Sequence, residues 1–257
     1  MKLSVVIITK DEEENIGRCL ESIKWADEII IVDAISQDKT VDVAKRYTDR
    51  IISHKWISFL DQRSFALRLA KCDFVLILDA DEFLDDAAQD EIKKTLTSNE
   101  PRNGYFIMRV TYFLEKRLSF SERPDPIMRL FRREKGFVTN KPGQRGHEAY
   151  GVCGETRLLD GTIEHRTSGT IAERLRKINR YSTLWAEERV ECGMRRPSAA
   201  KMLYAPLKSF IGNFFIKIGF LDGFYGFIWC ILKALENFLK YAKLWERMKY
   251  AGIFYLF

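Results

Sequence analysis

The stretch FVLILDADE, residues 74–82, decides the fold: an uninterrupted apolar run ends in Asp79, Ala80, Asp81 and Glu82. Short apolar runs of this kind are typical of strands buried on both faces, as in parallel sheets. The polar residues therefore begin where the predicted strand ends.

Two similar runs precede this one. Leu3–Ile8 is followed by Thr9, and Ile29–Val32 is followed by Asp33. Apolar residues at helical spacing separate the runs, so the β-α-β-α order predicts a doubly wound α/β half over residues 1–98.

The pattern changes twice in the rest of the chain. Alternating apolar residues with Pro and Gly over 105–152 predict mixed strands and long loops, and residues 170–191 have a helical pattern. An apolar and basic stretch over 202–249 predicts two helices that meet around 219–226. The predicted fold is an α/β domain with a mixed, mainly parallel sheet flanked by helices, followed by an amphipathic helical extension over 196–257.

The composition is that of an ordinary folded protein, with 46% hydrophobic, 13% aromatic and 30% charged residues among 257. A chain of this length can bury a sizeable core without help from a metal or a disulfide. The five cysteines are widely spread and form no CxxC pair, which argues against a zinc knuckle or disulfide framework and fits a reducing cytosol. The first residues lack the long apolar segment and the cleavage site of a signal peptide.

The net charge of +6 is concentrated near the C-terminus. From Lys201 onward there are eight basic and three acidic residues, so the first 200 residues carry only +1. A nucleic-acid-binding protein would carry the excess on its folded domain. Basic residues within the most hydrophobic stretch indicate instead a helix pair lying on an anionic membrane surface. A helix pair packed on the rest of the chain or on a second subunit is the alternative.

Polar side chains at the carboxyl ends of neighbouring strands define the expected site. Neither GxGxxG after the first strand nor GxxxxGK[ST] anywhere occurs, which disfavours dinucleotide-binding and P-loop proteins. Adjacent carboxylates repel one another unless a hard cation lies between them, and Mg²⁺ or Mn²⁺ is commonly shared with substrate phosphates. The sequence thus predicts a metal-bound diphosphate. The alternative is a solvated loop in which Asp81 caps a helix.

Three motifs in this order resemble the family 2 glycosyltransferases of GT-A fold: SVVIITKDE at 4–12, IVD with SQDKT within 31–40, and LDADE at 78–82. The segment FLDQRSFAL at 59–67 narrows the resemblance to the lipopolysaccharide-core β-glucosyltransferase branch. The resemblance covers most of the chain.

This resemblance implies a nucleotide-sugar site formed by seven residues: Thr9, Glu12, Asp33, Gln62, Arg63, Asp79 and Ala80. It further implies that Asp81, the second aspartate of a DXD motif, holds the metal on the diphosphate. His165 is a candidate metal ligand or diphosphate contact, and a hydrogen-bonded structural histidine is the alternative.

An acidic catalytic base is implied at Glu148, in a His-Glu pair where many relatives have Glu-Asp. The acceptor hydroxyl loses its proton as it attacks, and one base without a covalent nucleophile gives inversion at C1. The alternative for Glu148 is a surface carboxylate paired with Arg145. Alternation over residues 129–133 predicts a strand with Leu130 and Phe131 on opposite faces and basic edges, where one arginine could meet a phosphate.

Together these observations predict a metal-dependent, inverting hexosyltransferase that uses Mn²⁺ or Mg²⁺ and a UDP-sugar, with glucose as first choice. The acceptor would be a lipid-linked saccharide such as the lipopolysaccharide inner core, or else a polyprenyl-phosphate or glycolipid. The alternative from another class is a non-catalytic nucleotide-sugar-binding scaffold on a membrane.

Three parts are expected along the chain. They are a nucleotide-sugar-binding half (1–98), an acceptor-binding and catalytic half (99–195) and a membrane-associating extension (196–257). The protein is expected to be cytoplasmic and peripheral on the inner face of the cytoplasmic membrane. It would have no nucleic-acid partner, and self-association into a homo-oligomer is left open.

Overall fold

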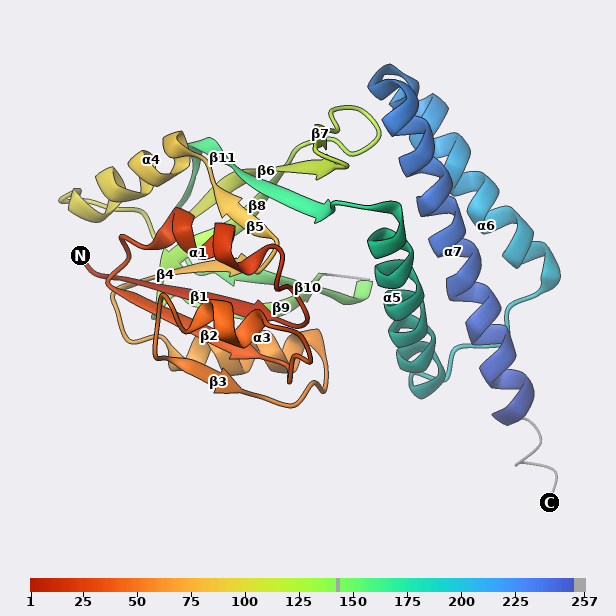
Figure 1. Cartoon of the computed structure of the whole chain (residues 1–257), viewed down its shortest axis with the longest axis horizontal. Helices are drawn as coiled ribbons and strands as arrows, with labels where there is room; N and C mark the ends of the chain where they lie inside the picture. Colours follow the sequence, from red (N-terminus) through yellow and green to blue (C-terminus); the bar gives the residue numbers. More distant parts are fainter. Residues whose placement is uncertain (142–143, 252–257) are drawn as a thin grey trace. The chain divides into compact units, whose positions relative to one another are not determined.

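The structure is a computed structural model that describes residues 1–141 and 144–251 (Figure 1). Its elements in chain order are β1 (Leu3–Thr9), α1 (Ile16–Ile23), β2 (Glu28–Asp33), α2 (Thr40–Ala44), β3 (Ile51–Ser53), α3 (Phe59–Leu69), β4 (Phe74–Asp79), β5 (Glu82–Leu84), α4 (Asp86–Thr97), β6 (Gly104–Phe113), β7 (Lys116–Arg117), β8 (Asp125–Arg132), β9 (Gly136–Lys141), β10 (Gln144–Val152), β11 (Thr156–Ser168), α5 (Ile171–Glu191), α6 (Ala199–Ile211), the π-helical turn η1 (Gly212–Ile216), the 3₁₀ turn η2 (Gly219–Asp222) and α7 (Gly223–Ala251).

The chain divides into two compact units. The first, here called the sheet unit, consists of Met1–Val110 and Pro124–Arg166. The second, the helical unit, consists of Thr111–Arg123 and the chain from Thr167 onward. The strands β6 and β11 pass from one unit into the other.

The main sheet has the strand order β3-β2-β1-β4-β8-β6-β11-β5, with β7 paired to β6. The pairs β2–β3, β1–β2 and β1–β4 are parallel, whereas β8 runs antiparallel to both β4 and β6. A separate antiparallel pair is formed by β9 and β10. The predicted α/β fold class is confirmed. The N-terminal part of the chain forms the parallel half of the sheet, and the middle of the chain contributes the antiparallel strands.

Both faces of the parallel half are buried, as the apolar runs predict. Val5 and Ile7 of β1 pack on one side with α1 and α4, and Val6 packs on the other side with Ala66 of α3. The same alternation holds on β8, where Leu130 and Phe131 enter the two different cores. The expectation that these two neighbours face opposite ways is therefore confirmed.

In the helical unit, α5 begins at a Thr170 cap whose Oγ1 accepts the Glu173 N–H, and it ends at Glu191 as the sequence predicts. The long helix α7 packs along α5. Arg174 donates to Glu236 at 3.1 Å, and Arg247 donates to Glu187 at 2.7 Å.

Several basic residues of the tail are therefore engaged inside the helical unit. Besides Arg247, Lys243 donates to the Asn179 carbonyl at 2.6 Å, Lys240 pairs with Glu236 at 2.8 Å, and Lys233 pairs with Glu122. These basic side chains are thus held by partners within their own unit, and association of the extension with a membrane stays a prediction.

The break between α6 and α7 falls where the sequence predicts it. At this break η1 and η2 replace regular helix, and Ile218 adopts a left-handed φ of 56°. Within the described parts of the chain, no single helix combines the length and apolar character needed to cross a bilayer. The pair Ala199–Ile216 and Gly219–Met248, bent by 75°, meets that criterion when taken together.

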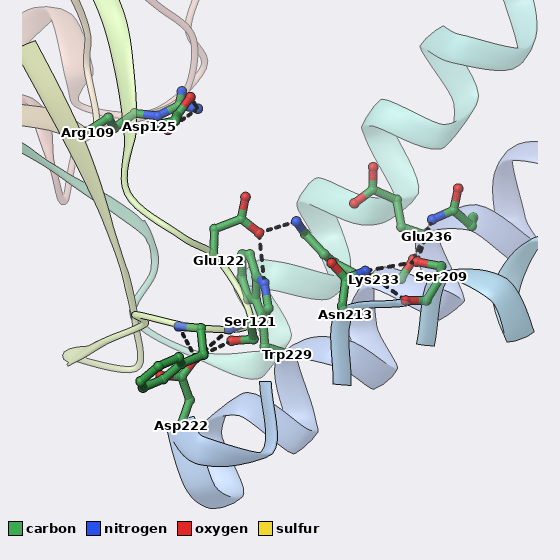
Figure 2. A network of polar contacts seen from close by, with 12 residues as sticks. Arg109, Ser121, Glu122, Asp125, Ser209, Asn213, Asp222, Trp229, Lys233 and Glu236 are labelled. Atoms are coloured by element: carbon green, nitrogen blue, oxygen red, sulfur yellow. Dashed lines mark hydrogen bonds and ion pairs between the residues drawn. The ribbon is translucent and has the colours of Figure 1, made fainter. Parts of the chain in front are cut away.

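A carboxylate clasp holds the bend to the segment 119–121 (Figure 2). Asp222 accepts the backbone N–H groups of Ser119, Phe120 and Ser121 at 2.7–3.1 Å, and the Ser121 hydroxyl at 2.6 Å. Burial alone would raise the pKa of Asp222, but these hydrogen bonds lower it. The clasp thus depends on the ionised carboxylate.

Replacing Asp222 with Asn should destabilise the protein by about 2 kcal/mol near neutral pH, because a neutral amide accepts these bonds more weakly and solvent already screens part of the interaction. The contribution of a carboxyl with a lowered pKa is complete above its unfolded pKa and is lost as the pH falls through its folded pKa. Thermal unfolding of wild type and D222N from neutral to acidic pH measures this. The gap in Tm should close toward acid, and a gap independent of pH would contradict the clasp.

Candidate active site at the carboxyl edge of the parallel strands

The three parallel strands β1, β2 and β4 end together. Thr9 is opposite Asp33 in the β1–β2 register, and Ile8 is opposite Asp79 in the β1–β4 register. Because these strands are adjacent, the side chains that follow the three apolar runs are gathered at one edge of the sheet. This is the edge at which the sequence predicts a ligand.

The loops after β1 and β2 are joined by hydrogen bonds. Buried Asp33 accepts the backbone N–H of Ser36 at 2.9 Å and its hydroxyl at 2.5 Å. The Glu12 N–H donates to Thr40 Oγ1 at 2.8 Å, and the Lys39 N–H donates to the Glu13 carboxylate at 2.9 Å. Since α1 begins only at Ile16, Glu13 lies before the helix, and its carboxylate links the loop after β1 to the loop after β2.

Thr9 Oγ1 and Gln62 Oε1 are among the buried polar atoms that have no hydrogen-bond partner within the described residues. Gln62, on α3, donates through Nε2 to the His54 carbonyl at 2.9 Å, so its oxygen is held in place. A buried orphan of this kind costs free energy unless a ligand satisfies it. Both residues belong to the expected nucleotide-sugar site.

Asp79 is neutralised by arginines from two other elements. Arg129 of β8 donates to Asp79 Oδ2 at 3.0 Å, and Arg63 of α3 lies 3.8 Å from Oδ1. Burial alone would raise the pKa of Asp79, but the two guanidinium groups lower it below its usual range. Asp79 is thus an ionised carboxylate whose two oxygens face the guanidinium groups of Arg129 and Arg63.

Glu82 is fully buried directly behind Asp79. It accepts Arg129 Nη2 at 2.6 Å and the Asp79 backbone N–H at 3.1 Å, and Arg109 lies 3.8 Å from its Oε1. Burial raises the pKa of Glu82, and the opposing charge of Arg129 limits the rise. Arg129 therefore joins the first and last carboxylates of the DADE run and fixes the turn between β4 and β5.

Asp81 points to a different partner. Its Oδ2 lies 3.5 Å from His165 Nε2, because β11 pairs with β5 so that His165 is opposite Glu82. Burial would lower the pKa of His165, but the carboxylates of Asp81 and Glu82 raise it. Asp81 does not cap a helix as the alternative interpretation held: the α4 cap is Asp85, whose carboxylate accepts the Ala88 N–H at 2.8 Å.

These residues fit a divalent cation. A carboxylate oxygen and an imidazole nitrogen face each other across 3.5 Å, and both are ligands that Mn²⁺ accepts, with Mg²⁺ favouring the carboxylate. No cluster of three or more His, Cys, Asp or Glu side chains able to hold a metal occurs within 1–141 and 144–251 where side chains are described. The remaining ligands would then have to come from substrate and water, as in diphosphate sites.

The expected base, Glu148, lies on β10, where its backbone is opposite Asn140 of β9 next to a shift in register. Its side chain, like those of Arg145 and His147, lies outside the described residues. The role of Glu148 and the alternative pairing with Arg145 both stay predictions.

Two residues of this site were not singled out by the sequence. Arg129 was one of three candidates for a phosphate contact, and the structure buries it against Asp79 and Glu82 instead. Tyr150, buried with its hydroxyl unpartnered among the described residues, lies under Arg63, whose guanidinium carbon is 5.6 Å from the ring centroid. For Arg129, the available sequence signal was its position at the centre of an apolar strand. No sequence signal marked Tyr150.

Comparison with known proteins gives the family. The family model for glycosyl transferase family 2 matches residues 4–159. An uncharacterized glycosyltransferase of Rickettsia typhi is 32% identical over 95% of this chain and 87% of its own length. The lipopolysaccharide core biosynthesis glycosyltransferase LpsC of Rhizobium meliloti is 30% identical over 96% of this chain and 93% of its own length. The chain belongs to glycosyl transferase family 2.

Solved structures give weaker likenesses. Staphylococcus aureus TarS 1–349 in complex with UDP-GlcNAc is 13% identical over 98% of this chain and 92% of that chain, with a TM-score of 0.47. Glucosyl-3-phosphoglycerate synthase from Mycobacterium tuberculosis, in complex with Mn²⁺, UDP and glucosyl-3-phosphoglycerate, is 17% identical over 77% and 82%, with a TM-score of 0.44. Neither adds to the family assignment.

Replacing Arg129 with Met should cost about 3–5 kcal/mol of stability, because it takes from the buried Glu82 and the partly buried Asp79 the one guanidinium that is hydrogen-bonded to both. Adding Glu82→Gln to this variant should recover part of the loss, since the amide oxygen still accepts the Asp79 N–H without a second buried charge. Urea unfolding of the single and double variants measures the effect.

Arg109→Met is the matched control, because Arg109 is more distant from Glu82 and partly exposed. Its loss should be about 1 kcal/mol or less. Equal losses in R129M and R109M, or no recovery in the double variant, would contradict the central role of Arg129.

Proposed function

We propose that this chain is a metal-dependent, inverting hexosyltransferase that moves a hexose, glucose first, from a UDP-sugar to a lipid-linked saccharide. The observation that carries the proposal is that the two aspartates of the DADE run have different partners. Asp79 is held by Arg129 and Arg63, whereas Asp81 faces His165. The Asp79 carboxylate is thus engaged by arginines of the protein, whereas the Asp81 carboxylate lies beside an imidazole, which is also a metal ligand.

The donor would bind at the edge where the parallel strands end. The proposed nucleotide-sugar contacts are Thr9, Glu12, Asp33, Gln62, Arg63, Asp79 and Ala80. The orphaned oxygens of Thr9 and Gln62 support this, because a base or ribose would supply the missing partners. Arg63 lies where its charge can be shared between Asp79 and a diphosphate.

Mn²⁺ or Mg²⁺ would be held by Asp81 and His165. When bound, the cation neutralises the negative charge that grows on the leaving diphosphate as the C1–O bond breaks. Because a metal-bound imidazole must be neutral, metal binding would have to displace the proton whose pKa on His165 is raised by Asp81 and Glu82. Glu82 and Arg129 act only through the turn that carries these ligands.

Glu148 is proposed as the base that removes the acceptor hydroxyl proton. A single base working on one face of the sugar, with no nucleophilic side chain, gives inversion at C1. The proposed catalytic half, 99–195, contains both Glu148 and His165. The nucleotide half, 1–98, contains the proposed nucleotide-sugar contacts and Asp81.

For the acceptor we propose the lipopolysaccharide inner core, which the similarity to the lipopolysaccharide core biosynthesis glycosyltransferase LpsC supports. A lipid-linked acceptor requires the enzyme to work at a membrane surface. We therefore propose a cytoplasmic protein that is peripheral on the inner face of the cytoplasmic membrane and uses residues 196–257 to associate with it.

Asp81→Ala should abolish metal-dependent release of nucleotide from the productive donor, lowering kcat/KM by about 10²-fold or more. A panel of UDP-, GDP- and dTDP-sugars with a lipid-linked core acceptor, each with and without Mn²⁺, measures the activity. Asp86→Asn, on the exposed first turn of α4, is the control and should keep it. Absence of release from every donor together with no UDP binding would leave the non-catalytic scaffold as the better account.

Glu148→Gln should lower kcat by about 10²–10⁴-fold while leaving the Kd for UDP unchanged, because the amide cannot take the acceptor proton. Arg145→Gln is the companion variant. Wild-type turnover in E148Q would remove Glu148 from the mechanism, and a parallel loss in R145Q would point to the surface pair instead.

A further inference from the structure

The bend between α6 and α7 carries an exposed apolar surface. Five large side chains form it, and they are between 46% and 76% exposed: Phe215, Ile216, Phe220, Leu221 and Phe224. We call these residues the bend surface. They come from η1, η2 and the first turn of α7, so the surface is centred on the break and not on the face of one helix.

Charge is almost absent from this part of the chain. Residues 209–228 contain only Lys217 and Asp222 as charged residues. The carboxylate of Asp222 is directed at the segment 119–121, where it accepts three backbone N–H groups and the Ser121 hydroxyl (Figure 2). The acid that interrupts the apolar stretch in the sequence is therefore engaged on the inner side of the bend.

The bend is held rigidly from within. Phe214 packs against Phe210 and Phe227 at centroid distances of 5.3 and 5.8 Å, which joins α6 to α7. A Cβ at Gly219 would lie 2.5 Å from the Asn213 carbonyl, and one at Gly226 would lie 2.3 Å from the Gly219 carbonyl. These close approaches need glycine at both positions, and they bring the backbones of the two sides of the bend together.

A second clasp lies beside the first. Glu122 accepts the Trp229 indole N–H at 3.1 Å and pairs with Lys233, both on α7 (Figure 2). Trp229 in turn packs on Phe113 at 5.2 Å. The polar inner side of the bend is thus satisfied by the helical unit itself, which leaves the outer apolar side for another partner.

The exposed apolar residues continue from the bend along both helices. Leu203, Leu207 and Ile211 follow one another at four-residue spacing on α6, and Ile231 and Phe238 are exposed on α7. Exposed Lys208 and Lys217 flank this surface. An apolar centre with basic flanks matches an anionic bilayer, where apolar side chains enter the acyl region and lysines meet the headgroups.

We propose that the bend surface inserts as a wedge into the lipid bilayer, with Lys208 and Lys217 at the headgroups and the Asp222 clasp keeping the wedge rigid. This deepens the proposed function and rests on it only for the lipid-linked acceptor that makes a membrane position useful. A second copy of the chain is a less suitable occupant, because the flanking lysines of two symmetric copies would repel at a twofold contact.

The first test is co-sedimentation of the full chain with vesicles of zwitterionic phospholipid containing a quarter anionic lipid, at low and high salt. The double variant Ile216→Ser with Phe224→Ser should bind at least about tenfold more weakly than wild type at both salt concentrations. The control Leu158→Ser, at an aliphatic position of the sheet unit that is 50% exposed, should bind as wild type does. Equal binding by wild type and the double variant would overturn the wedge.

The second test places the wedge directly. Tryptophan fluorescence of Phe224→Trp, corrected with wild type, should be quenched by vesicles whose acyl chains are brominated. Absence of added quenching would overturn the proposal. Sedimentation velocity without vesicles distinguishes the second copy: a wild-type dimer that the double serine variant dissociates would also overturn it.

The outcome is separable from the proposed function. UDP binding and donor hydrolysis by the double serine variant should remain at wild-type levels, since the substitutions lie outside the candidate site. Loss of vesicle binding with hydrolysis retained supports the wedge alone. Vesicle binding that depends on the bend surface, in a protein that neither binds UDP nor releases nucleotide from any donor in the presence of acceptor, would support the wedge and refute the proposed enzyme.

Discussion

The arrangement of the site depends on two neighbouring carboxylates, the fully buried Glu82 and the partly buried Asp79. Without a cation between them each would be driven toward its neutral form by burial and by the other's charge. Arg129 resolves this with one guanidinium that reaches both. It can do so because β8 runs antiparallel to β4, which puts the arginine beside the carboxyl end of that strand.

That constraint explains how neighbouring residues in DADE acquire different tasks. Arg129 and Arg63 occupy Asp79, and Glu82 holds the Asp79 backbone N–H. Asp81, between them, is turned toward His165, which arrives on β11 from far along the chain. A buried ion network therefore determines which carboxylate is presented with a second ligand.

Much of the parallel half was predictable from the sequence, because strands buried on both faces leave uninterrupted apolar runs and their ends coincide in a parallel sheet. The polar residues after each run were predicted for the same reason. The identity of the arginine that meets Asp79 was not, since Arg129, Arg132 and Arg133 look alike in sequence and only the pairing of β4 with β8 selects one. The partners of the tail lysines were not predictable either. Lys233 pairs with Glu122 and Lys243 donates to Asn179, and both partners are more than fifty residues away in the sequence. Local patterning does not report contacts at that separation.

The measurement that tests the central claim most directly is the position of Mn²⁺ in crystals grown with UDP, located by its anomalous scattering. The account predicts a single strong peak within bonding distance of Asp81 and His165 Nε2, with the uridine beside Thr9 and Asp33. It also predicts that Asp79 remains bound to Arg129. A manganese peak on Asp79 with Arg129 displaced, or UDP bound away from the strand ends, would contradict the account.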